Sequence, residues 1–103
     1  MPFSRFTTAL LDNGTARVGG PFGFGPLEQK MTVASLSFVL VQGDQLVHGT
    51  GGAEGDKWDG QASPAHNLET GQPVQAFGIA LLVKPGPQPA FQTYGWSDQL
   101  DLE

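Results

Sequence analysis

The chain is predicted to be an all-β protein of short antiparallel strands, and three features of the sequence lead to this expectation. Fifteen glycines and eight prolines interrupt the 103 residues, and both residue types are unfavourable inside a helix. Several segments alternate apolar and polar residues with a period of two, as a half-buried strand does. Turn-forming dipeptides such as Asn13-Gly14 separate these segments.

The length and composition limit the kinds of site that the chain can carry. A chain of 103 residues matches the usual size of one domain, so we expect residues 1–103 to form a single unit. There are no cysteines, which excludes a disulfide framework, a thiolate metal site and a cysteine nucleophile. No signal peptide or membrane-spanning segment is visible in the sequence, so we expect a cytoplasmic protein.

The charge is negative and unevenly distributed. Ten acidic and five basic residues give a net charge of −5, and residues 44–103 carry eight of the acids but two of the bases. Binding to phosphates requires clustered lysine and arginine side chains, which the sequence does not supply. We therefore expect neither a nucleic acid nor an anionic membrane surface as a partner.

The first predicted element is a hairpin over residues 3–24. Its turn is Asn13-Gly14, because asparagine and glycine tolerate the positive φ angles of a two-residue hairpin turn. This turn places Leu11 opposite Ala16. The segment from Gly19 to Pro26 is rich in glycine and proline, which favours a bent edge strand.

The second predicted hairpin covers residues 32–51 and turns at Gly43-Asp44. This register places Phe38 opposite Gly49, so that the phenylalanine ring has room to lie over the partner strand. His48 then falls on the less apolar face of the hairpin. The next segment is rich in loops, with a short strand over residues 57–61.

The C-terminal hairpin is predicted over residues 74–102, around the proline-rich turn 85–89. Its first strand contains five consecutive apolar residues, Ile79 to Val83. A continuous apolar run is typical of a strand that is covered on both faces. We therefore expect other parts of the chain to pack over each side of this strand.

These elements together predict an antiparallel β-sandwich of two sheets and about seven strands. The pattern resembles immunoglobulin-like and fibronectin type III domains in architecture, without a motif of either family. A small Greek-key barrel is the alternative. The predicted strands lie near residues 3–11, 15–24, 32–42, 45–51, 57–61, 74–84 and 91–102.

An acidic cluster is the most suggestive candidate for a ligand site. Glu54, Asp56 and Asp59 supply three carboxylates around Trp58 in a glycine-rich segment. Carboxylate oxygens bind Ca²⁺, and a tryptophan ring stacks on sugars, so a lectin-like or calcium-binding module is one hypothesis. The alternative, which we favour, is that Trp58 fills the core, as large aromatic side chains usually do.

The two histidines, His48 and His66, are candidate metal ligands of a small metal-dependent enzyme. Their spacing matches no metal motif. Ser63, His66 and Asp59 are the residue types of a catalytic triad. We do not assign one, because Ser63 precedes a proline in a loop and lacks a nucleophile elbow. We expect no catalytic residue, no metal ligand and no cofactor.

The function that the sequence favours is a non-catalytic module that binds or assembles through protein–protein contacts. The partner is another protein or a second copy of the chain, since regular hairpins offer edge strands for pairing. The candidate interface residues are Phe22 and Phe24 in the first hairpin and Tyr94 and Trp96 in the last strand. The tyrosine and tryptophan line the core in the competing interpretation.

Overall fold

The computed structural model describes residues 6–21, 31–55 and 57–103, and their secondary structure is entirely β. The all-β prediction is confirmed. Each described strand overlaps a predicted one, and residues 3–5 and 22–24 of the first predicted hairpin lie outside the described residues. The strands are β1 (Thr8–Asp12), β2 (Thr15–Pro21), β3 (Thr32–Gln42), β4 (Gln45–Glu54), β5 (Lys57–Ala62), β6 (Pro73–Lys84) and β7 (Ala90–Asp101).

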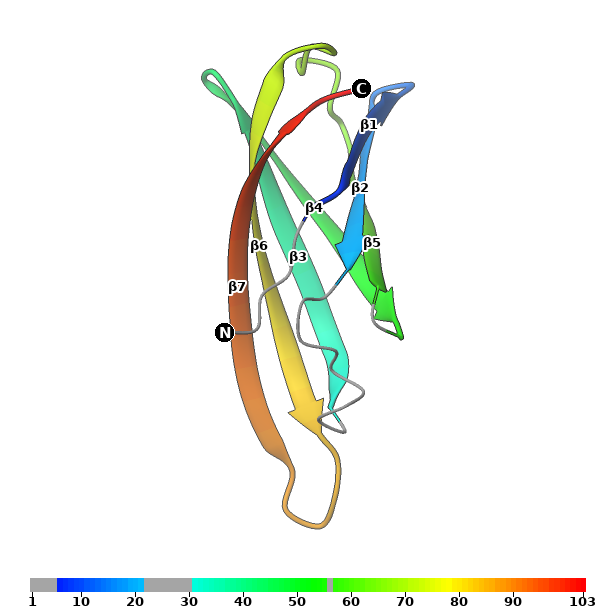
Figure 1. Cartoon of the computed structure of the whole chain (residues 1–103), viewed down its shortest axis with the longest axis vertical. Helices are drawn as coiled ribbons and strands as arrows, with labels where there is room; N and C mark the ends of the chain where they lie inside the picture. Colours follow the sequence, from blue (N-terminus) through cyan, green and yellow to red (C-terminus); the bar gives the residue numbers. More distant parts are fainter. Residues whose placement is uncertain (1–5, 22–30, 56) are drawn as a thin grey trace.

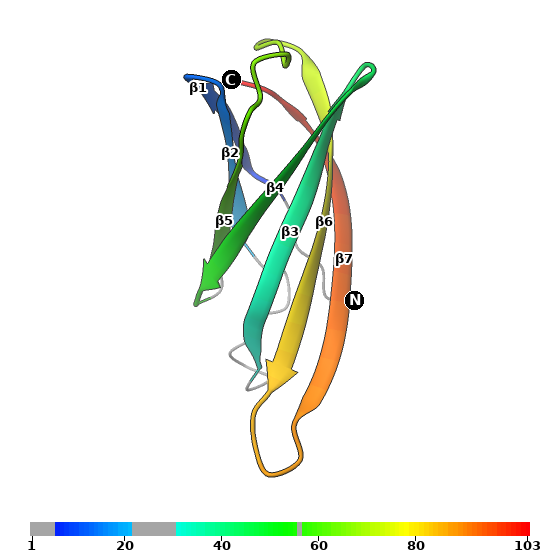
Figure 2. The same ribbon diagram turned by 180° about the vertical axis from the view of Figure 1, so that it is seen from behind.

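The seven strands form one antiparallel sheet in the order β1-β2-β5-β4-β3-β6-β7. The sheet curls into a half-barrel, and the chain end after β7 approaches β1 (Figures 1 and 2). Backbone hydrogen bonds join these two edges at one end. The Leu11 amide donates to the Glu103 carbonyl oxygen at 2.7 Å, and the Glu103 amide donates to Ala9 at 2.9 Å.

The predicted division into two sheets is not confirmed. Strand β5 pairs with β2 on one side and with β4 on the other, so it joins the first hairpin to the rest of the sheet. The connections contain a Greek key, since β3, β4 and β5 are consecutive neighbours and β6 returns to lie beside β3. This topology is closer to the alternative prediction of a Greek-key barrel, although the sheet closes at one end alone.

The hairpin registers are those that the turn residues predict. Asn13 has a φ of 50° and Gly14 a φ of 76°, and Leu11 lies opposite Ala16. In the second hairpin Phe38 lies opposite Gly49. A two-residue turn fixes the register of its strands, which is why these pairings could be derived from the sequence.

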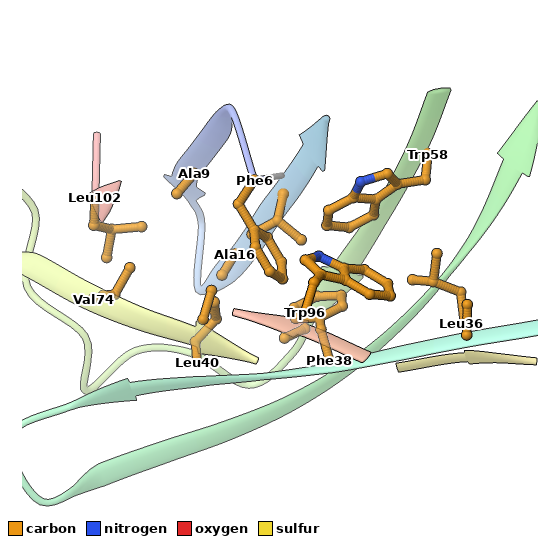
Figure 3. Close-up of a cluster of buried hydrophobic side chains, with 14 of the residues drawn as sticks. Phe6, Ala9, Ala16, Leu36, Phe38, Leu40, Trp58, Val74, Trp96 and Leu102 are labelled. Carbon is orange, nitrogen blue, oxygen red and sulfur yellow. The ribbon is translucent and has the colours of Figure 1, made fainter. Parts of the chain in front are cut away.

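The concave face of the sheet holds the core, and aromatic rings form its centre (Figure 3). The ring of Trp58 in β5 meets Phe6 edge-on, with centroids 4.8 Å apart, and Trp96 of β7 at 5.5 Å. Phe38 of β3 lies 6.4 Å from Trp58, and Tyr94 lies 6.1 Å from Trp96. Rings from three strands of one sheet therefore meet because the sheet is curled.

Glycines on β4 and β5 make room for one of these rings. A Cβ at Gly49 would fall on the Phe38 ring and within 2.7 Å of the Gln61 carbonyl oxygen. A Cβ at Gly60 would lie 2.8 Å from the same ring. Gly52, on the same strand as Gly49, has nothing within 4 Å of a built Cβ.

We predict that Gly49→Ala lowers the free energy of unfolding by about 1–3 kcal/mol, because the added methyl group overpacks the ring of Phe38. Gly52→Ala is the matched control. It is expected to be neutral or to stabilise by up to about 1 kcal/mol, since the site is open and alanine restricts the unfolded chain. Urea unfolding of both variants measures the difference, and equal effects would contradict this packing.

Candidate binding face

The convex side of the sheet carries large apolar side chains that are exposed and that no part of residues 6–21, 31–55 and 57–103 covers. Along β6, Ala80 and Leu82 point inward and are buried, while Phe77 and Ile79 point outward and are 47% and 51% exposed. Leu46 on β4 and Phe91 on β7 are 67% and 66% exposed. The expectation that the run Ile79 to Val83 is covered on both faces is therefore wrong within a single chain.

These side chains belong to regular rows across the sheet. Ser37 of β3, Ile79 of β6 and Gly95 of β7 are direct cross-strand neighbours. The next such row begins at Val39 and ends at Ser97, with Phe77 between them. We use the name outer apolar face for one set of outward-pointing residues. It consists of the outward residues of β6 between 75 and 83 and of the outward residues beside them on β3, β4 and β7.

The outer apolar face contains no charged side chain among its described positions. Its polar members are serine, threonine and glutamine residues and His48. The absence is informative because the chain as a whole carries 15 charged side chains. Charged residues are normally the most frequent residues on an exposed surface and are depleted at the centre of protein interfaces.

The relief of this face is uneven. Phe77 and Ile79 stand along β6 as a ridge, and shorter side chains lie beside it, Ser37 and Val39 on β3 and Gly95 and Ser97 on β7. A Cβ built at Gly95 would meet one atom within 4 Å, the Gly78 carbonyl oxygen at 3.7 Å. The face therefore offers both a projecting ridge and shallow troughs beside it.

The candidate ligand residues of the acidic cluster are only partly brought together. Glu54, Trp58 and Asp59 line a pocket with a volume of about 970 Å³, while Asp56 lies outside the described residues. Alternation along β5 turns Asp59 outward and Trp58 inward, and the tryptophan is 3% exposed. A buried ring offers no face for stacking on a sugar, so this placement agrees with a core role for Trp58.

The two histidines occupy different surroundings. His48 is exposed on β4 opposite Val39, as the hairpin register predicts. The ring of His66 lies against Gly14 in the turn between β1 and β2. In the described part of the chain, no three histidine, aspartate or glutamate side chains are placed so that they could hold a metal ion.

The candidate interface residues fall into two groups. Tyr94 and Trp96 point into the concave core and are each 8% exposed, which agrees with their competing interpretation as core residues. Phe22 and Phe24 lie outside the described residues. The outer apolar face was missed, although Phe77 and the run Ile79 to Val83 signal it, because an uninterrupted apolar strand is normally covered on both faces.

Comparisons with known proteins add no relative. No protein-family model, no curated protein sequence and no solved structure matches the chain. Within residues 6–21, 31–55 and 57–103, no helix is long and apolar enough to cross a membrane.

We predict that Trp58→Ala lowers the free energy of unfolding by about 3–5 kcal/mol, the usual cost of removing a large buried aromatic side chain. Trp58→Phe is expected to cost clearly less, because it keeps most of the ring volume. It also removes a buried Nε1–H that has no hydrogen-bond partner among the described residues. Urea unfolding measures both variants, and equal losses would contradict a packing role.

Proposed function

We propose that the protein is a non-catalytic module that binds another protein chain through the outer apolar face. The observation that carries this proposal is the exposure of Phe77 and Ile79 within the outer apolar face, whose described positions carry no charged side chain. Interface centres combine aromatic and aliphatic side chains with few charged residues. A regular sheet also holds these side chains in fixed positions, which lowers the entropic cost of binding.

The amount of exposed apolar surface supports the proposal. Phe77, Ile79, Leu46 and Phe91 expose roughly 450 Å² together, if a large apolar side chain has about 200 Å² to expose. Phe77 and Ile79 are neighbours on β6, whereas Leu46 and Phe91 lie toward the two ends of the outer apolar face. Burying this area would contribute about 11 kcal/mol at 25 cal/mol per Å². Association costs about 4–15 kcal/mol, so the face can support a modest affinity when the rest of the contact is well matched.

A photo-activated cross-linking amino acid in place of Ile79 tests this proposal in the native cells. It is expected to trap a polypeptide, because the side chain stands at the centre of the proposed interface. The same amino acid in place of Gln61 is the matched control, since Gln61 is exposed on β5 beside the polar residues Arg17 and Thr50. Gel electrophoresis and mass spectrometry identify the trapped species.

A discrete product from position 79, absent from position 61, supports the proposed binding face. If neither position yields a product, or if both yield the same products, the outer apolar face is not a specific protein-binding surface.

A further inference from the structure

We infer that the partner of the outer apolar face is a second copy of this chain, packed face to face about a two-fold axis. This inference rests on the proposed function and names the partner. In such a dimer each chain contributes one sheet to a sandwich, with the two sheets about 10 Å apart. Ile79 and its neighbours on β6 are then covered on both faces, as the apolar run Ile79 to Val83 requires.

The shape of the face suits a symmetric pair. Beside Phe77 and Ile79 on β6 lie Val39 and Ser37 on β3, one strand away. In a two-fold interface the same surface contacts itself, so Phe77 and Ile79 of each copy can lie on Val39 and Ser37 of the other. A two-fold axis that runs along the strands between β3 and β6 aligns both contacts at once, and β4, β3, β6 and β7 of the two copies then overlap.

The charge distribution also favours a second copy. Each chain carries a net charge of −5, so two copies repel one another over most of their surfaces. The outer apolar face is the exception, because its outward positions on β3, β6 and β7 in the described chain carry neither acids nor bases. Two copies can therefore meet there without burying a charge or pairing like charges, both of which are costly.

The available area matches what a stable dimer needs. Specific interfaces bury about 800 Å² on each partner. The molecule measures 46 Å by 23 Å across its two longer dimensions, and the strands of the outer face run along the long one. Phe77 and Ile79 lie at the centre of such an interface, and Leu46 and Phe91 lie toward its two ends. The serine, threonine and glutamine residues of the same strands form its polar rim.

Sedimentation equilibrium of the purified chain tests the inference. The wild type is expected to show twice the chain mass at about 100 μM, a concentration that suits an affinity in the micromolar range. Ile79→Lys is expected to weaken association about 100-fold or more, because the two-fold axis puts two ammonium groups into one apolar contact. Gln61→Lys, which adds the same charge to an exposed position on β5, is expected to leave the dimer unchanged.

A second variant separates loss of association from loss of folding. Ile79→Thr keeps a β-branched side chain on the strand, and we expect it to weaken the dimer about 10-fold. Circular dichroism and the melting temperature at a fixed low concentration show whether each monomer remains folded. A folded Ile79→Thr variant whose dimer dissociation constant is about 10-fold above that of the wild type supports the inference even if Ile79→Lys misfolds.

Two outcomes overturn the inference. A wild type that stays monomeric at about 1 mM has an affinity too weak for the proposed pair. A dimer that both Ile79 variants leave intact uses a different surface, such as the edge of β7. The cross-links from position 79 then test the proposed function separately from the dimer. A different protein trapped there keeps the binding face and removes self-pairing, whereas no trapped protein together with a monomeric wild type removes both.

Discussion

The packing of Trp58 against Phe6 and Trp96 is the contact on which the rest of the structure depends. A single sheet has two faces and no second layer of its own, so it can bury one face only by curling around it. Side chains from β5 and β7, which are separated in the sheet by β4, β3 and β6, meet in this cluster. Gly49 on β4 and Gly60 on β5 have no side chains, which leaves room for the ring of Phe38 to pack against this cluster.

Curling the sheet around one face leaves the other face without cover. The exposed face of an isolated sheet is normally polar, which keeps the monomer separate from its neighbours. Here the outward positions of β6 include Phe77, Ile79 and Leu81, while charged side chains lie elsewhere on the described surface. The same residues that make β6 a strong strand thus make its outer face a surface for another chain. Fold and proposed function are connected through this strand.

Local features could be predicted from the sequence because short turns determine them. The Asn13-Gly14 and Gly43-Asp44 turns set the registers of both hairpins, including the contact of Phe38 with Gly49 and the outward position of His48. The number of sheets could not be predicted, because the pairing of β5 with β2, which joins the first hairpin to the rest of the sheet, connects segments that are distant in the sequence. The outer apolar face was missed for a related reason. A run of apolar residues indicates that both faces of a strand are buried, but it does not indicate whether the residues that bury them belong to the same chain.

Intermolecular nuclear Overhauser effects test the dimer most directly. Equal amounts of ¹³C-labelled and unlabelled chain would be mixed, and a filtered experiment would record only contacts between copies. The account predicts signals from the Ile79 methyl groups to protons of β3 in the partner, near Ser37, because Ile79 of one copy lies on Ser37 of the other. Signals confined to the edge of β7, or the absence of any contact between copies in a concentrated sample, would contradict it.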